Sequence, residues 1–147
     1  MSIESDLGKY LDGTTNRSEF VIRYHIGDDF STETQFDLRG DGAFDLWSTA
    51  THGRQRRTFS GQLDINQVQQ VVTALQETRF WEVQHIKTHP GEDDPEASIA
   101  VTAGGDSFQV TLWVSEIRHS PIFNKAQQLL LALVHEISGG QVLENGQ

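Results

Sequence analysis

The fold of this chain is decided by residues 34–46, TQFDLRGDGAFDL, in which two alternating runs flank a glycine-rich turn. Phe36 and Leu38 precede the turn, and Phe44 and Leu46 follow it. Glycine and aspartate tolerate the positive φ angles that tight hairpin turns require. The two flanking runs are therefore predicted to be antiparallel strands with one apolar face.

A second hairpin signal, Ala103-Gly104-Gly105-Asp106, separates two more alternating runs. Ile99 and Val101 precede this turn, and residues 108–114 alternate after it. Two further strands are predicted, one over residues 20–26 and one around residues 59–63. The chain is therefore expected to form a sheet of about six strands.

Two helices are predicted from their caps and their apolar spacing. Asp64 with Gln67 resembles a capping box before the apolar positions of residues 65–75, and Ser120-Pro121 supplies an N-cap with proline at the first helical position. The apolar stripe of the second helix is predicted to hold Ile122, Ala126, Leu129, Leu130, Leu133 and Ile137, widened by Phe123, Leu131 and Val134. The element order ββββαββα indicates an α+β fold, an antiparallel sheet with two helices packed on one face. The wide stripe fits either a central helix or a homodimer interface.

A length of 147 residues suits one domain. Residues 1–17 are polar without sustained periodicity and are predicted to be a flexible N-terminal arm. The α+β domain is expected over residues 18–139, with residues 140–147 as a C-terminal tail.

Composition limits the classes of function. The absence of cysteine excludes disulfides and thiol chemistry, and it fits a cytoplasmic protein. Net charge is −10, from 21 acidic and 11 basic residues, which argues against nucleic acid as a partner. The N-terminus lacks a secretory signal pattern, and no apolar run is long enough for a membrane span. No phosphate-loop or dinucleotide motif is present, so no cofactor is predicted.

Two tryptophans fall out of phase with the apolar faces of their predicted strands. Trp47 follows Leu46, and Trp113 follows Leu112. Tryptophan on an exposed sheet face indicates that a partner, a ligand or the N-terminal arm covers that face. Alternatively, the assumed register is wrong by one residue, which would turn both rings to the other face.

The dense basic cluster is formed by His52, Arg54, Arg56 and Arg57. Guanidinium groups bind phosphates and carboxylates through paired hydrogen bonds, so this cluster is a candidate site for a small anionic ligand or an acidic partner. The alternatives are a solvated loop and pairing with the acidic loop around Asp93.

A candidate metal site lies between His85 and Glu96. His85, His89, Asp93 and Asp94 have the side chains that bind Zn²⁺ or Ca²⁺. Pro90 argues against the helix that would bring the two histidines onto one face, so a solvated loop is the competing interpretation.

The sequence therefore favours a binding module for a protein or small ligand, acting through Trp47, Trp113, Arg54, Arg56 and Arg57, and not an enzyme. One alternative is a metal-dependent hydrolase that uses the His85–Glu96 loop. Another is an acidic antagonist of a basic protein.

Overall fold

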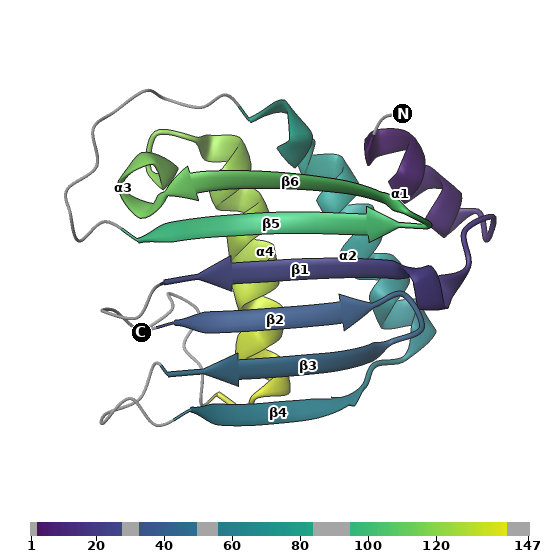
Figure 1. Ribbon diagram of the computed structural model, residues 1–147, viewed down its shortest axis with the longest axis horizontal. Coiled ribbons are helices and arrows are strands. Elements are labelled where there is room, and N and C mark those ends of the chain that lie inside the picture. Colours follow the sequence, from purple (N-terminus) through teal and green to yellow (C-terminus); the bar gives the residue numbers. More distant parts are fainter. Residues whose placement is uncertain (1–2, 28–32, 50–55, 84–94, 141–147) are drawn as a thin grey trace.

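The computed structural model describes residues 3–27, 33–49, 56–83 and 95–140 of the chain. Six antiparallel strands form one sheet in the order β4-β3-β2-β1-β5-β6 (Figure 1). The strands are β1 (Phe20–Ile26), β2 (Thr34–Arg39), β3 (Ala43–Ser48), β4 (Arg57–Gln62), β5 (Glu96–Ala103) and β6 (Asp106–Trp113). The predicted α+β class and antiparallel sheet are confirmed.

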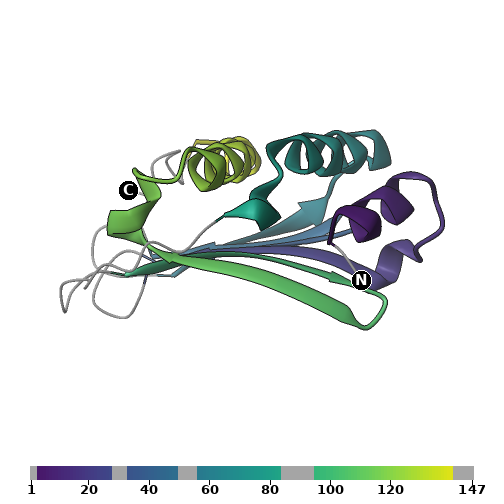
Figure 2. The same cartoon turned by 90° about the horizontal axis from the view of Figure 1, so that it is seen from above.

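The main helices all lie on one side of this sheet (Figure 2). They are α1 (Ile3–Leu11), α2 (Ile65–Thr78) and α4 (Pro121–Ile137). The short helix α3 (Val114–Ile117) follows β6, and the 3-10 turns η1 (Arg17–Glu19) and η3 (Phe80–Glu82) precede β1 and follow α2. The core lies between the helices and the facing side of the sheet, where Phe36, Leu75 and Leu130 are fully buried.

The turn and cap predictions agree with the structure. The β2–β3 turn has Gly42 at a φ of 100°, and Asp41 accepts hydrogen bonds from Arg39 Nε at 2.9 Å and from the Ala43 backbone N–H at 3.1 Å. At the start of α2, the Asp64 carboxylate accepts from the Asn66 N–H, and the Gln67 side chain accepts from the Asp64 N–H. Because these bonds are local, the sequence pattern was sufficient to predict them.

The prediction of a flexible arm over residues 1–17 requires correction. Residues 3–11 form α1, whose Leu7 is fully buried and whose Tyr10 is 2% exposed. The Tyr10 hydroxyl donates a hydrogen bond to the Gly40 carbonyl at 2.6 Å, and its ring stacks on Phe20 at 4.4 Å between centroids. This helix therefore contributes to the core. Of the predicted C-terminal tail, residues 141–147 lie outside the described residues.

The buried side of α4 is also rotated from the predicted stripe. Its buried residues are Phe123, Ala126, Gln127, Leu130, Leu131 and Val134, whereas Ile122, Leu129, Leu133 and Ile137 are only partly buried. The reason is that α4 packs against the sheet with α2 at its side, so Leu129 and Leu133 face the groove between the two helices. Among the described residues, no helix combines the length and apolar character needed to cross a membrane.

Candidate functional site

The candidate site is the side of the sheet that faces away from the helices, here called the open face. Directly paired residues of antiparallel strands point to the same side, so the register defines its members. One row across all six strands holds Thr58, Trp47, Gln35, His25, Ser98 and Thr111, and the next holds Ser60, Asp45, Asp37, Arg23, Ala100 and Gln109. None of these side chains is buried, whereas most of their strand neighbours on the helix side are. Because most members are polar, this face is stable in contact with water.

Both strand tryptophans belong to the open face. Trp47 pairs with Gln35 on one side and Thr58 on the other, and Trp113 pairs with Glu96. Each ring is half-buried. The predicted placement off the core face is therefore confirmed, and the alternative of a one-residue register error is wrong. Their role in binding stays a prediction.

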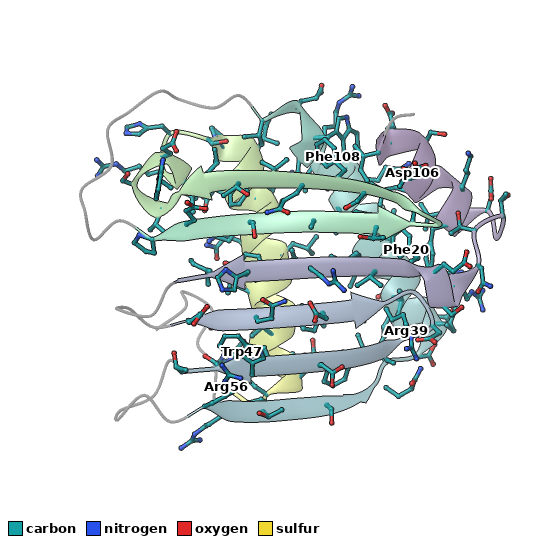
Figure 3. All side chains as sticks on the ribbon, in the orientation of Figure 1. Phe20, Arg39, Trp47, Arg56, Asp106 and Phe108 are labelled. Atoms are coloured by element: carbon teal, nitrogen blue, oxygen red, sulfur yellow. The ribbon has the colours of Figure 1, made fainter. Side chains whose placement is uncertain are left out.

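Arg56 covers one of these tryptophans. Its guanidinium carbon lies 4.0 Å from the centroid of the Trp47 ring, and Figure 3 shows the two side chains together beside the start of β4. A cation over an aromatic face is attracted by the ring quadrupole, with about 0.5–1 kcal/mol at exposed sites. The pair makes a flat, cationic and aromatic surface at one edge of the open face.

Of the rest of the predicted basic cluster, Arg57 does not join Arg56, and His52 lies outside the described residues. Arg57 pairs with Ser48, which is buried on the helix side, so Arg57 projects from the opposite face of the sheet from Trp47. Adjacent residues in a strand point to opposite sides of the sheet, whereas the sequence prediction placed Arg56 and Arg57 together in a loop. Arg54 lies outside the described residues. A clamp formed jointly by Arg56 and Arg57 is therefore not present.

The basic side chains near the centre of the open face lie next to carboxylates. Arg23 Nε lies 3.6 Å from Asp37 Oδ1, and His25 Nε2 lies 2.6 Å from Glu33 Oε2. At the β2–β3 turn, the hydrogen bond from Arg39 holds the pKa of the Asp41 carboxyl below its usual value. Each of these basic side chains therefore has an acidic neighbour within the chain.

A hollow of about 310 Å³ lies at the β6 end of the open face. We call it the Trp113 hollow; its polar and aromatic lining includes Trp113, Glu96, Gln109, Thr111, Ser98 and His25. The Gln109 side-chain N–H donates to the Thr111 hydroxyl at 3.1 Å, which directs the Gln109 amide. Sequence analysis identified Trp113 but missed its polar neighbours. The period-two alternation marked them as outward-facing, but only the strand order brings His25 of β1 beside β5 and β6.

A buried carboxylate lies on α3, immediately after the end of β6. Glu116 is 2% exposed, and its Oε1 accepts a hydrogen bond from the Trp113 backbone N–H at 3.0 Å. Its Oε2 is buried and has no hydrogen-bond partner among the described residues. Nothing in the sequence indicated this position, because the buried environment of Glu116 is created by tertiary packing.

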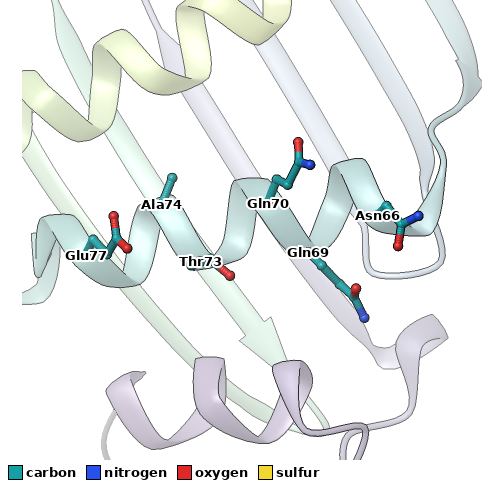
Figure 4. A pocket seen from close by; sticks show the side chains of 6 residues that line it. All are labelled: Asn66, Gln69, Gln70, Thr73, Ala74 and Glu77. Atoms are coloured by element: carbon teal, nitrogen blue, oxygen red, sulfur yellow. The ribbon is translucent and has the colours of Figure 1, made fainter.

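Two other hollows have fewer polar and aromatic groups suited to a specific contact. One, of about 520 Å³, runs along the outer side of α2, and Figure 4 shows that all of its lining residues come from that helix. Glu77 is its single ionisable side chain among the residues drawn. The other, of about 370 Å³, is the groove between α2 and α4, lined by apolar residues such as Val71, Leu129 and Leu133.

The predicted metal site is not tested by the structure. His85, His89, Asp93 and Asp94 lie outside the described residues. Within the described ranges, no three histidine or carboxylate side chains come close enough together to hold a metal ion. The metal-dependent hydrolase therefore stays a hypothesis from sequence.

Comparison of the chain with protein family models and with curated proteins finds no match. Function is therefore inferred from the geometry and chemistry of the open face.

Proposed function

We propose that this protein is a non-enzymatic binding module whose recognition surface is the open face of its sheet. The observation that carries the proposal is the position of Trp47 and Trp113, half-exposed on β3 and β6 on the side that none of the described helices covers. Tryptophan is enriched at the centres of binding interfaces, because its large ring gains much from desolvation while its N–H can be hydrogen-bonded. A partner that spans the face would bury both rings.

The polar residues between the two tryptophans support a specific contact. Serine, threonine and glutamine side chains at these positions offer both donors and acceptors, and the contacts Arg23–Asp37, His25–Glu33 and Gln35–Asp37 hold several side chains in place. A rigid polar surface loses little conformational entropy when it is bound. The face therefore fits a protein partner better than an apolar ligand. A small anionic ligand is supported by Arg56 alone, since Arg57 lies on the opposite side.

The proposal is tested by obstructing the face and comparing the proteins captured from the native source. Ala100 lies in the middle of the open face between Arg23 and Gln109, and Ala132 is exposed on α4 on the other side of the molecule. Ala100→Arg and Ala132→Arg introduce the same side chain and the same charge. We expect a stoichiometric partner that is captured by the wild type and by Ala132→Arg but is lost with Ala100→Arg.

Thermal unfolding of both variants shows that each is folded before capture is compared. Equal capture by the two variants would show that the open face is not the recognition surface. Capture that is lost only with Ala132→Arg would place the interface on the helices, at the groove between α2 and α4.

A further inference from the structure

One tryptophan of the open face already has a cation stacked on its ring. Arg56 lies flat over Trp47 at 4.0 Å. Trp113 occupies the other end of the open face and is also half-exposed, but no arginine or lysine of the described residues covers it. Among the described residues, the ring of Trp113 is thus the one of the two whose face has no cation over it.

A free carboxylate lies beside that ring. Glu96 is the direct cross-strand partner of Trp113, so the Cβ atoms of the two residues are about 4.5–5.5 Å apart and their side chains share the open face. Glu96 is exposed and forms no ion pair with any residue that the structure describes. An aromatic face next to an unpaired carboxylate attracts a cation through both the ring quadrupole and the negative charge.

The surroundings of the Trp113 hollow favour a positive group with several N–H donors. The Gln109 amide donates to Thr111, which leaves its carbonyl oxygen as an acceptor. Arg23, the nearby cation of the open face, does not oppose binding strongly, because it is paired with Asp37.

We propose that Trp113 and Glu96 form the subsite for an arginine side chain presented by a basic protein partner. This inference rests on the proposed function of the open face and names the chemistry of its partner. The guanidinium stacks on the Trp113 ring and forms a charged hydrogen bond with Glu96, while its remaining N–H groups face the oxygens of Gln109 and Thr111.

Arginine fits this subsite better than lysine for a geometric reason. A planar guanidinium stacks on an aromatic ring and donates hydrogen bonds from its edge at the same time, whereas an ammonium is a compact and strongly hydrated charge. The net charge of −10 also raises the association rate with a positively charged protein and disfavours nucleic acid.

The test uses the full-length protein and a fluorescein-labelled peptide of alternating arginine and serine. Two matched peptides replace arginine with lysine or with citrulline, the neutral analogue of the same shape. Binding is measured by fluorescence anisotropy at about 0.15 M salt, where interactions between distant exposed charges are screened. The indole N–H resonance of Trp113, assigned by its absence in Trp113→Leu, is followed by NMR during the titration.

Three variants locate the binding. Trp113→Leu and Glu96→Gln remove the two parts of the subsite, and we expect each to weaken binding by about 3-fold to 10-fold. Glu77→Gln removes the same charge as Glu96→Gln from the exposed side of α2 and should bind as the wild type does. Because Glu96 is exposed, Glu96→Gln tests the subsite even if Trp113→Leu is poorly folded.

The inference is supported if the arginine peptide binds most tightly, the citrulline peptide does not bind, and the Trp113 resonance shifts while that of Trp81 does not. Equal binding by Glu96→Gln and Glu77→Gln would overturn it, since only net charge would then matter. Equal affinity for the lysine peptide would overturn the assignment to arginine. Equally tight binding of N-acetyl-arginine methylamide would replace the protein partner with a small cationic ligand. Loss of capture by Ala100→Arg without any arginine binding would refute this inference and leave the proposed function standing.

Discussion

Substitution of Tyr10 tests whether the N-terminal helix is a structural part of the domain. Tyr10 is 2% exposed, donates a 2.6 Å hydrogen bond to the Gly40 carbonyl and stacks on Phe20. Burial also raises the pKa of its phenol, which is consistent with a ring that is largely removed from water. Tyr10→Ala removes both contacts and leaves a cavity between α1 and the β1–β2 end of the sheet.

The expected magnitude follows from these contacts. Replacing a buried aromatic side chain by alanine lowers the free energy of unfolding by about 3–5 kcal/mol. Tyr10→Phe keeps the ring but leaves the Gly40 carbonyl without its partner, at a cost of about 1–3 kcal/mol. For a domain of this size, 1 kcal/mol corresponds to about 2–4 °C in Tm. We therefore expect Tm to fall by roughly 6–20 °C for Tyr10→Ala and roughly 2–12 °C for Tyr10→Phe.

Urea unfolding followed by circular dichroism gives the free energy, and a thermal scan gives Tm. Lys9→Ala is the matched control, because Lys9 is the exposed neighbour of Tyr10 in the same helix. Its unfolding free energy should stay within about 0.5 kcal/mol of the wild type. If Tyr10→Ala were as stable as Lys9→Ala, α1 would not be docked, and the original prediction of a flexible arm would be restored.

Three further predictions concern the core, its pH dependence and a turn. Tyr24→Phe leaves the buried Gln127 amide without the hydroxyl that accepts its 2.9 Å hydrogen bond. The free energy of unfolding, measured with urea, should therefore fall by about 1–3 kcal/mol. Adding Gln127→Leu to Tyr24→Phe should restore most of this loss, as a double-mutant cycle would show. Burial raises the pKa of Tyr24 well above its usual value of 10.0, so the unfolded chain loses this proton at a lower pH than the folded protein does. The contribution of Tyr24 to stability is therefore complete below pH 10 and is lost as pH rises above 10. Tm should fall as pH rises above 10, and less steeply in Tyr24→Phe, whereas parallel slopes would contradict this assignment. Gly42 and Gly105 have nearly the same φ, 100° and 103°, but an added Cβ would clash with the Leu63 carbonyl oxygen only at Gly42. Thermal scans should therefore show a larger loss of Tm for Gly42→Ala than for Gly105→Ala. Equal losses would mean that the positive φ alone accounts for the destabilisation.

The parts of the fold that depend on neighbouring residues could be predicted from sequence. Alternation around residues 40–42 predicted the β2–β3 hairpin, and Asp64 with Gln67 predicted the start of α2, because their turns and caps are satisfied within a few residues. Residues 3–11 gave no comparable signal, since the segment is short and contains Gly8. The helix is stabilised by burial of Leu7 and Tyr10 against groups far along the chain, which sequence spacing does not reveal.

In the candidate site, too, some features could be predicted from the sequence and others depend on tertiary structure. Period-two alternation predicted that Trp47 and Trp113 leave the core face, because a strand turns each successive side chain to the opposite side. The strand register in the structure then excluded the one-residue shift that the sequence left open. Tertiary structure alone decided that Arg56 covers Trp47 and that Arg57 lies on the helix side of the sheet. It also decided that β5 pairs with β1, which brings His25 to the Trp113 hollow. The physical reason is that turns, caps and alternation are local properties of the chain. The choice of strand neighbours depends instead on burying a common core, to which every strand and helix contributes at once.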